Sequence, residues 1–347
     1  MTNATGEVRI LLIGAGNLGR RFARMIAEKH DELHGRYGLD LRIVGVADSR
    51  GAVIDAAGLD GRAIAAIKET GGSVGDLPDV GRPGMSGLAM LEACDADILC
   101  EAGPVNLDSG GEPGLTHVRA ALERGMHVTT PNKGPIVLAY RELTELAERH
   151  GASLRFDGTV AGGLPALYVG MRDLRGATIA RIDAIPNLTT GFVIDRIVAG
   201  ASWDEAIEAA TVAGALEGDG AWDLDGWDAA AKLSILAQAV LGVDAPIDEI
   251  PRVGVRELDP EWLRAECAGG RRVRLLASAF RNDEGGYDLL VSPTKMPKDH
   301  PLAVLGSTSM GIVYETDIYG TITAIIDEPT PLPSAATMLR DLLDIYA

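Results

Sequence analysis

The chain has 347 residues, too many for one core of ordinary size, so we expect two domains. Hydrophobic residues make up 46% of it, yet no run approaches the ~18 consecutive apolar residues that a membrane-spanning helix needs. A net charge of -18 argues against nucleic acid and anionic membranes as partners, because both would repel it. The first residues carry no export signal, which predicts a cytoplasmic protein.

Cysteine and lysine usage adds two expectations. Cys94, Cys100 and Cys267 lie in or beside apolar runs and lack metal-ligand spacing, so we expect buried, reduced thiols. Lysine is scarce relative to arginine. A lysine beside a predicted site is therefore less readily explained as a surface residue without a function.

A glycine-rich turn follows the first apolar run. Residues 8–13 indicate a buried strand, and the sequence GAGNLG then leads straight into a helical pattern over 20–33. Strand, tight turn and helix is the context in which this motif predicts dinucleotide binding. The middle glycine lets the main chain approach a pyrophosphate, and the last lets helix and strand pack closely. The predicted contacts are Gly14, Gly16, Asn17, Leu18 and Gly19.

The end of the second strand bears on the choice between NAD and NADP. Residues 41–47 form an apolar run that ends in Asp48, farther from the turn than the usual ~20 residues because of a polar insert at 30–40. Asp48 can accept hydrogen bonds from the ribose hydroxyls of NAD, whereas Arg50 can meet the 2′-phosphate of NADP. We expect NAD or NADP, with a slight preference for NAD. Asp48 as an ordinary turn residue is the structural alternative.

Strands and helices then alternate along the chain. The expected strands are 97–101, 127–129 and 153–156, and the expected helices are 113–124 and 134–149. Alternation of this kind is typical of a doubly wound, parallel Rossmann sheet, so the fold class is α/β. Residues 1–156 are the predicted dinucleotide-binding domain.

Two of these strand ends carry residues on the side where such sheets bind ligands. Gly103 and Pro104 follow one strand, and Asn132 and Lys133 follow the next, so all four are predicted to contact the cofactor. A lysine at a helix N-terminus opposes the helix dipole, which favours a function over a solvated surface lysine. Lys133 is a candidate for holding a substrate carboxylate or assisting proton transfer.

The pattern changes after residue 156. Consecutive strands joined by short turns predict antiparallel pairing, and hence an α+β domain over 157–330. The expected elements are strands at 179–185, 272–280, 288–291, 311–318 and 321–326, and helices at 190–198, 202–216 and 227–241. The last helix, within 334–347, is predicted to pack back on the first domain.

The most acidic stretch is 217–232, with the sequence EGDGAWDLDGWDAAAK. Asp228 and Lys232 are four residues apart, so on a helix their side chains share one face, and a substrate at the helix start could contact both. A solvated acidic loop with an ordinary surface ion pair explains the same pattern. The stretch by itself leaves both interpretations open.

Five segments make the chain resemble homoserine dehydrogenase, in the short form without a regulatory domain. They are 13–20 (IGAGNLGR), 130–140 (TPNKGPIVLAY), 157–167 (DGTVAGGLPAL), 185–194 (IPNLTTGFVI) and 217–236 (EGDGAWDLDGWDAAAKLSIL). The resemblance spans nearly the whole length, and the last segment is the most specific. The resemblance implies an enzyme of amino-acid biosynthesis that forms a homodimer.

The resemblance also implies roles for single residues. Lys232 would be the acid/base group, with Lys133 assisting and Asp228 supporting the site. The amino acid substrate would be bound by Glu217, Asp223, Asn187, Thr189 and Thr190. A monovalent cation would be held, largely by main-chain oxygens, near Asp157, Val160, Gly162 and Leu164.

The chain departs from the family in the residues that surround the charged residues of this site. Where the family usually has NGTTNYI, Leu188 replaces a glycine and Gly191 replaces an asparagine. Residues 326–331 replace a glycine-rich GxGAG turn near the nicotinamide, and Gly218, Gly220 and Trp222 do not follow the usual pattern. The charged residues of the site are kept, whereas the residues around them differ from those of the family. A substrate related to homoserine is therefore an open alternative.

The leading hypothesis is an NAD(P)-dependent oxidoreductase that interconverts homoserine and aspartate 4-semialdehyde, or a closely related hydroxy amino acid and aldehyde, by hydride transfer. Lys232 would give its proton to the developing alkoxide. One alternative is an amino acid dehydrogenase of the aspartate dehydrogenase type, which acts at a C–N bond. The other is a non-catalytic dinucleotide-binding paralogue, which the lost GxGAG turn would explain.

Overall fold

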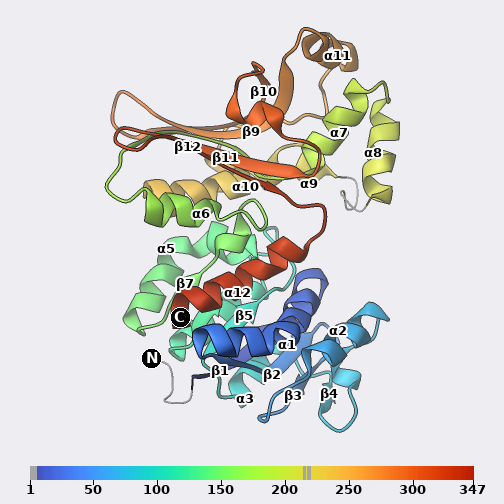
Figure 1. Cartoon of the computed structure of the whole chain (residues 1–347), viewed down its shortest axis with the longest axis vertical. Helices are drawn as coiled ribbons and strands as arrows, with labels where there is room; N and C mark the ends of the chain where they lie inside the picture. The colour runs from blue at the N-terminus through green and yellow to red at the C-terminus, as the bar shows by residue number, and fades with distance from the viewer. Residues whose placement is uncertain (1–5, 214–215, 217–219) are drawn as a thin grey trace. The chain divides into compact units, whose positions relative to one another are not determined.

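The computed structural model describes residues 6–213, 216 and 220–347. Contacts divide the chain into two units (Figure 1). Unit 1 consists of Met1–Thr159 together with Pro331–Ala347, and unit 2 consists of Val160–Thr330. Unit 1 is therefore discontinuous in sequence, because its last segment follows the whole of unit 2.

Unit 1 is built on a mostly parallel sheet, which confirms the α/β fold class. Within the described residues its strand order is β4-β3-β2-β1-β5-β6-β7. The parallel strands are β1 (Glu7–Ile13), β2 (Asp40–Asp48), β5 (Ile98–Glu101), β6 (His127–Thr129) and β7 (Leu154–Arg155), and the antiparallel ones are β3 (Gly51–Ile54) and β4 (Gly81–Pro83). The order reverses between β1 and β5, where open sheets of this kind bind their ligands.

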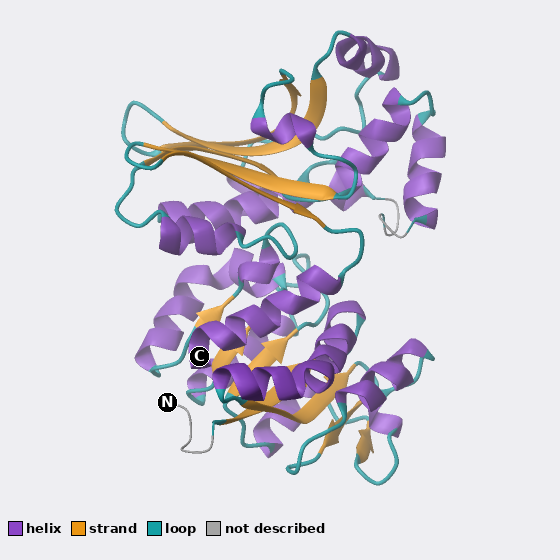
Figure 2. Ribbon diagram, viewed as in Figure 1, coloured by secondary structure: helices purple, strands orange, loops and turns teal. Residues whose placement is uncertain are grey.

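Helices cover the unit 1 sheet (Figure 2). They are α1 (Asn17–Tyr37), α2 (Gly61–Glu69), α3 (Gly87–Ala93), α4 (Gly114–Glu123), α5 (Lys133–Arg149) and α12 (Leu332–Tyr346). Helix α12 lies beside α1 (Figure 1) and adds Met338 and Leu342, both fully buried, to the same core as β1. The Asp341 carboxylate also accepts a hydrogen bond from the Thr129 hydroxyl of β6 (2.6 Å).

Three features of the structure differ from what the sequence predicts. The polar insert expected at 30–40 is mainly helical, because α1 continues to Tyr37 and ends at Gly38, which has a φ of 70°. The edge strands β3 and β4 were not expected; they are short and pair antiparallel. Cys94 and Cys100 are buried as expected, but Cys267 of unit 2 is only partly buried.

Unit 2 has an antiparallel sheet, as expected for an α+β arrangement. In the part of the chain that the structure describes, its order is β10-β9-β8-β11-β12. The strands are β8 (Ile179–Ile185), β9 (Arg272–Arg281), β10 (Tyr287–Met296), β11 (Ser309–Thr316) and β12 (Gly320–Asp327). Strand β12 lies at one edge of this sheet.

The helices of unit 2 include the one that carries the acidic stretch. They are α6 (Ala166–Tyr168), α7 (Thr189–Val198), α8 (Trp203–Val212), α9 (Ala221–Leu224), α10 (Trp227–Leu236) and α11 (Pro260–Ala268), with one π-helical turn after α6 and another after α10. Helix α10 packs against β9 and β10, and its residues 229–231 are fully buried alanines. Among the described residues, no helix is both long and apolar enough to cross a membrane.

Candidate active site

The glycine turn after β1 has the shape that a dinucleotide requires. Gly14 has a φ of 95°, and a Cβ there would lie 2.3 Å from main-chain atoms of the loop after β5. A Cβ at Gly19 would lie 1.9 Å from the Gly14 carbonyl oxygen, so only glycine lets α1 start this close to the turn. A Cβ at Gly16 would meet nothing within 4 Å, and Gly16 offers no side chain to cap α1. The helix N-terminus at Asn17 and Leu18 therefore suits an anion such as a pyrophosphate.

Asp48 ends β2, and its carboxylate is engaged within unit 1. Oδ1 accepts hydrogen bonds from the Ser73 hydroxyl (2.8 Å) and the Arg50 main-chain N–H (2.9 Å). Oδ2 accepts from the Lys68 ammonium (2.6 Å) and the Val74 N–H (3.0 Å). Burial raises the pKa of Asp48, but these hydrogen bonds outweigh it and lower the pKa to about 2. The carboxylate expected to receive ribose hydroxyls thus holds a loop together, with Lys68 offsetting its charge.

Side chains at the ends of β5 and β6 form a second polar cluster in unit 1. The fully buried Glu101 accepts from the Asn132 Nδ2 at Oε2 (3.0 Å) and from the Gly103 N–H at Oε1 (3.1 Å). Asn132 Nδ2 also lies 3.3 Å from the Pro104 carbonyl oxygen. The three predicted cofactor residues of these loops are therefore brought together, directly before Lys133, the first residue of α5.

In unit 2, two acceptors hold the ammonium of Lys232. Its Nζ donates to Oδ2 of Asp228, one turn earlier in α10 (2.8 Å), and to the carbonyl oxygen of Pro186, just after β8 (2.8 Å). The side chains of Lys232 and Asp228 are only 12% and 5% exposed. The pair predicted from its spacing is thus buried, which rules out an ordinary solvated surface pair.

Asn187 connects this pair to a second carboxylate. Its Nδ2 donates to Oδ2 of Asp228 (3.0 Å) and lies 3.4 Å from Oδ1 of Asp223 in α9. The Thr190 hydroxyl donates to the Asn187 Oδ1 (2.9 Å), and Thr189 is buried beside it at the start of α7. The structure therefore gathers the predicted substrate residues of two separate segments. Glu217, the remaining one, lies outside the described residues.

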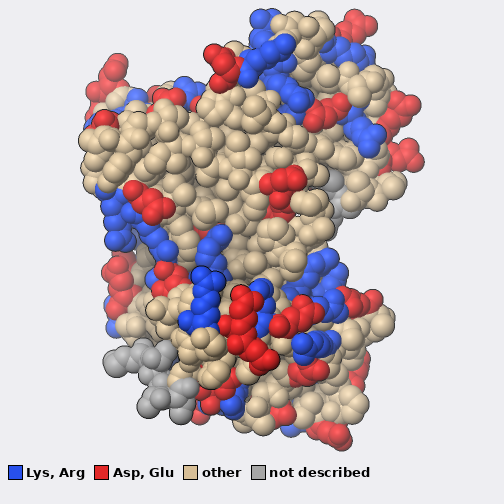
Figure 3. Space-filling model, viewed as in Figure 1, with Lys and Arg blue, Asp and Glu red and all other residues tan. Residues whose placement is uncertain are grey.

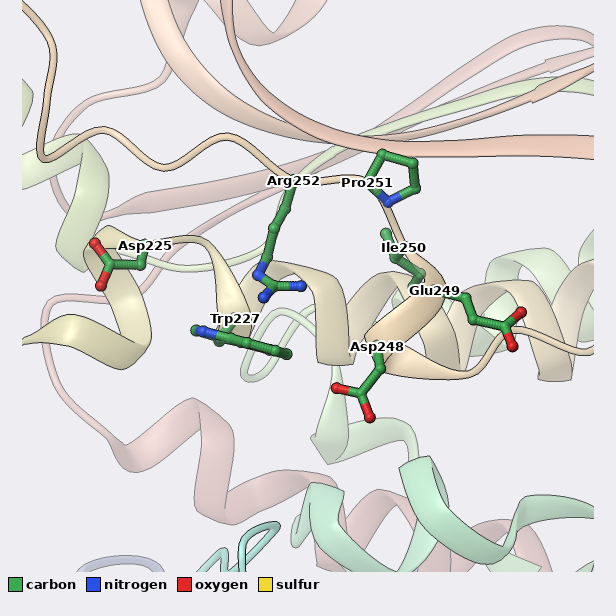
Figure 4. A pocket seen from close by; sticks show the side chains of 7 residues that line it. All are labelled: Asp225, Trp227, Asp248, Glu249, Ile250, Pro251 and Arg252. Atoms are coloured by element: carbon green, nitrogen blue, oxygen red, sulfur yellow. The ribbon is translucent and has the colours of Figure 1, made fainter.

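An aromatic stack adjoins this network. The rings of Trp222 and Trp227 stack with their centroids 5.7 Å apart, and the Arg252 guanidinium carbon lies 3.1 Å from the Trp227 centroid. Figure 4 shows the Arg252 side chain over the Trp227 ring. A pocket of about 470 Å³ opens beside Trp227. The two tryptophans directly precede Asp223 and Asp228, so the stack fixes α9 against α10 and with them the two carboxylates.

The structure also shows where the residues lie in which the sequence differs from the resembled pattern. Leu188 comes directly before α7, and a Cβ at Gly191 would have the Arg274 Nε as its nearest neighbour, at 3.8 Å. Glu328, in the stretch that replaces the glycine-rich turn, is 5% exposed and accepts from the Gly163 N–H (2.8 Å). A buried carboxylate thus lies in this stretch of the chain.

The positions predicted to hold a monovalent cation are divided between the units. The Asp157 carboxylate accepts a hydrogen bond from Arg340 of α12, within unit 1. Val160, Gly162 and Leu164 belong to a loop of unit 2 in which Gly162 has a φ of 57°. In the described ranges, no group of three or more His, Cys, Asp or Glu residues could hold a metal ion. A site made of main-chain oxygens stays a prediction.

Sequence reasoning did not identify several partners of the predicted residues. It missed Lys68 and Ser73 as donors to Asp48, and the carbonyl of Pro186 as an acceptor for Lys232. The scarcity of lysine was a usable signal for Lys68. Ser73 and Pro186 left no such signal, because their roles depend on where two loops come to lie.

Comparison with known proteins gives matches to both units. The family described as "Homoserine dehydrogenase, NAD binding domain" matches residues 14–157, and the family described as "Homoserine dehydrogenase" matches residues 165–343. The homoserine dehydrogenase of Methanocaldococcus jannaschii is 32% identical over 97% of this chain and 98% of its own length. The NAD(+)-dependent homoserine dehydrogenase of Pseudomonas canavaninivorans is 31% identical over 98% of this chain and 96% of its own length.

A solved structure extends this similarity to three dimensions. A hyperthermophilic archaeal homoserine dehydrogenase in complex with NADPH matches with a TM-score of 0.83 and 28% identity, over 97% of each chain. The similarity therefore includes both units.

Proposed function

Since the chain belongs to the homoserine dehydrogenase family of NAD- or NADP-dependent oxidoreductases that act on a CH–OH group, we propose that it interconverts homoserine and aspartate 4-semialdehyde. The observation that carries the proposal is the buried network of unit 2, in which the Lys232–Asp228 pair adjoins Asn187 and Asp223. A lysine beside acidic groups suits a substrate that has both a reacting oxygen and an ammonium group.

Lys232 is the group proposed to move the proton. In the reducing direction its ammonium donates to the alkoxide oxygen that forms at the carbonyl, and in the oxidising direction its amine accepts the hydroxyl proton. Its positive charge also stabilises the developing alkoxide. Asp228 and the Pro186 carbonyl hold Nζ in one place, as a positioned acid requires. Lys133, at the start of α5, is proposed to assist.

The acidic residues are proposed to recognise the substrate ammonium. Asp223 and Glu217 would accept its hydrogen bonds, as the family resemblance implies. The amide of Asn187 lies within reach of Asp223 and Asp228, and so offsets the repulsion between these two carboxylates. Thr190 fixes the orientation of that amide by donating to its oxygen.

Unit 1 is proposed to hold the dinucleotide, whose nicotinamide supplies or accepts the hydride when bound. The residues present fit this group, because Gly14 and Gly19 allow the tight turn and Gly16 leaves open space at the helix N-terminus. Gly103, Pro104 and Asn132 line the loops after β5 and β6 on the same edge of the sheet.

The alternatives have less support. The families that match both units are homoserine dehydrogenases, which favours oxidation of an alcohol over the C–N chemistry of an aspartate dehydrogenase. A non-catalytic paralogue would have no need for the buried contacts of Lys232 with Asp228 and Pro186.

The proposal is tested with the purified protein, homoserine and either oxidised dinucleotide, by the absorbance of the reduced nicotinamide. We expect turnover with homoserine and, in the reverse direction, turnover of aspartate 4-semialdehyde without ammonia. Activity that requires ammonia would identify an amino acid dehydrogenase instead. Tight dinucleotide binding with no turnover of any hydroxy compound would identify a non-catalytic paralogue.

Replacing Lys68 by methionine is expected to raise the preference for NAD over NADP. The change removes a cation and leaves the Asp48 carboxylate with a charge that repels a 2′-phosphate. We expect the ratio of kcat/KM for NAD to that for NADP to rise about tenfold, as for one charge interaction of about 1.4 kcal/mol. Lys29→Met, which removes an exposed lysine of α1 paired with Glu32, is the matched control and should leave the ratio unchanged.

We also propose a homodimer formed through the sheet of unit 2. The edge strand β12 and the turn before it carry the exposed apolar side chains of Ile318, Tyr319 and Ile325. Figure 3 shows few charged side chains over β11 and β12. Light scattering is expected to give twice the chain mass of 36.4 kDa, and Ile325→Lys is expected to shift it toward the monomer. A wild-type mass of one chain would contradict the proposal.

A further inference from the structure

We propose that Glu101 is a positioning residue of the reaction: through the side-chain amide of Asn132 it fixes the first turn of α5, and with it Lys133. The inference rests on the assisting role proposed for Lys133. Glu101 does not need to touch substrate or cofactor to act in this way.

The first step is the complete burial of the Glu101 carboxylate. It ends β5 with no exposed surface, so its charge must be satisfied by hydrogen bonds. Oε1 accepts from the Gly103 N–H (3.1 Å), and Oε2 accepts from the Asn132 Nδ2 (3.0 Å) and lies 3.4 Å from the Thr130 hydroxyl. His117 Nδ1 is 3.8 Å from Oε1, too far to donate. Each carboxylate oxygen therefore faces an N–H donor.

The second step is the capping of α5 by Asn132. Its Oδ1 accepts from the Gly134 N–H (3.0 Å), in the first turn of the helix that Lys133 begins. An amide has one accepting and one donating end. Because Glu101 can only accept, it turns the donating end of Asn132 toward itself and leaves the oxygen for the helix.

The third step is the close packing around these two side chains. A Cβ at Gly103 would lie 2.5 Å from the Glu101 Oε1, and a Cβ at Gly114 would lie 2.5 Å from the Asn132 Nδ2. The main chain at Ala102 also donates to the Ile13 carbonyl of β1 (2.7 Å). The cluster thus joins the end of β1 to the loops after β5 and β6, and the two glycines leave no room for a further side chain beside Glu101 and Asn132.

Glu101→Gln is the decisive variant, because it keeps the shape and turns one oxygen into a donor. The Gly103 N–H is main chain and cannot turn away, so the new NH₂ group must face the amide of Asn132. Either that contact is lost, or Asn132 turns over and presents its own NH₂ to the N–H of Gly134. We expect kcat to fall about tenfold to a hundredfold, as for one unsatisfied buried donor, with the KM for homoserine changed less than about threefold.

The double variant E101Q/N132D restores the pattern by exchanging donor and acceptor. The aspartate accepts from Gln at 101 and from the Gly134 N–H, and aspartate is a favoured helix cap. The double variant also gives up the contact of the Asn132 Nδ2 with the Pro104 carbonyl oxygen (3.3 Å), so we expect a kcat above that of either single variant and below that of the wild type. Asn132→Asp alone places two carboxylates together and should be at least as slow as E101Q. A double variant that is folded, by its melting temperature, yet no faster than the single ones would overturn the proposal.

Lys133→Ala separates this inference from the proposed function. The double variant E101Q/K133A should have a kcat less than about threefold below that of K133A, because Glu101 acts through Lys133. A larger added loss would show that Glu101 does not act through Lys133. If K133A turns over homoserine as fast as the wild type, the assisting role of Lys133 is wrong, and so is the route assigned to Glu101. If E101Q does not fold, an inactive or unfolded E101Q/N132D likewise overturns the proposal.

Discussion

Replacing Lys232 by alanine is expected to lower turnover about a thousandfold, within the range for loss of a general acid or base, while dinucleotide affinity stays the same. The variant removes the buried ammonium that Asp228 and the Pro186 carbonyl hold. The residues proposed to bind the dinucleotide belong to unit 1, and Lys232 belongs to unit 2. Initial rates with homoserine, together with calorimetric titration of the dinucleotide, measure the two effects separately.

Lys295→Ala is the matched control for this experiment. Lys295 lies in β10 of the same unit, where its exposed ammonium pairs with Glu266, and its loss should leave turnover unchanged. Equal rates for Lys232→Ala and the wild type would show that another group moves the proton. Lys133 would then be the first candidate.

Replacing Gly19 by alanine is expected to weaken dinucleotide binding at least about tenfold, the effect of losing roughly 1.4 kcal/mol. A Cβ at this position would lie 1.9 Å from the Gly14 carbonyl oxygen, so the turn and the start of α1 must move apart. That movement disturbs the N–H groups proposed to receive the pyrophosphate. Calorimetry of dinucleotide binding and the melting temperature of the free protein measure the effect on the site and on the fold.

Gly35→Ala in the same helix is the control, because a Cβ there would meet nothing within 4 Å. It should leave dinucleotide affinity unchanged and stabilise unit 1 by about 0.5–1 kcal/mol, since alanine loses less conformational entropy in a helix than glycine. If Gly19→Ala bound the dinucleotide like Gly35→Ala, the fingerprint would not be the pyrophosphate site.

The features that were predictable from the sequence are those that depend on neighbouring residues. The glycine turn follows from three positions within one strand–helix junction, and the Asp228–Lys232 pair follows from the spacing of one helical turn. The start of the helix expected at 202 is equally local, because Ser202 and Glu205 form a capping box at the start of α8. In each case a short stretch contains the whole physical cause.

The features that escaped prediction depend on residues far apart in the chain. Asp48 receives its donors from Lys68 and Val74, which follow it by 20 and 26 residues, and Asn187 meets Asp228 across 41 residues. The edge strands β3 and β4 have only four and three residues, so they show no alternation of apolar residues. Periodicity carries no information on such contacts, because tertiary packing decides them.

The return of α12 to unit 1 has a consequence for the order in which the chain folds during synthesis. Met338 and Leu342 complete the core around β1, and Asp341 accepts from Thr129, but the ribosome makes these residues only after all of unit 2. During synthesis, unit 1 therefore has an uncovered apolar face until α12 has been made. Unit 2 is continuous in sequence, so it can fold first. A chain that is released after residue 330 should accordingly bind chaperones through unit 1 rather than unit 2.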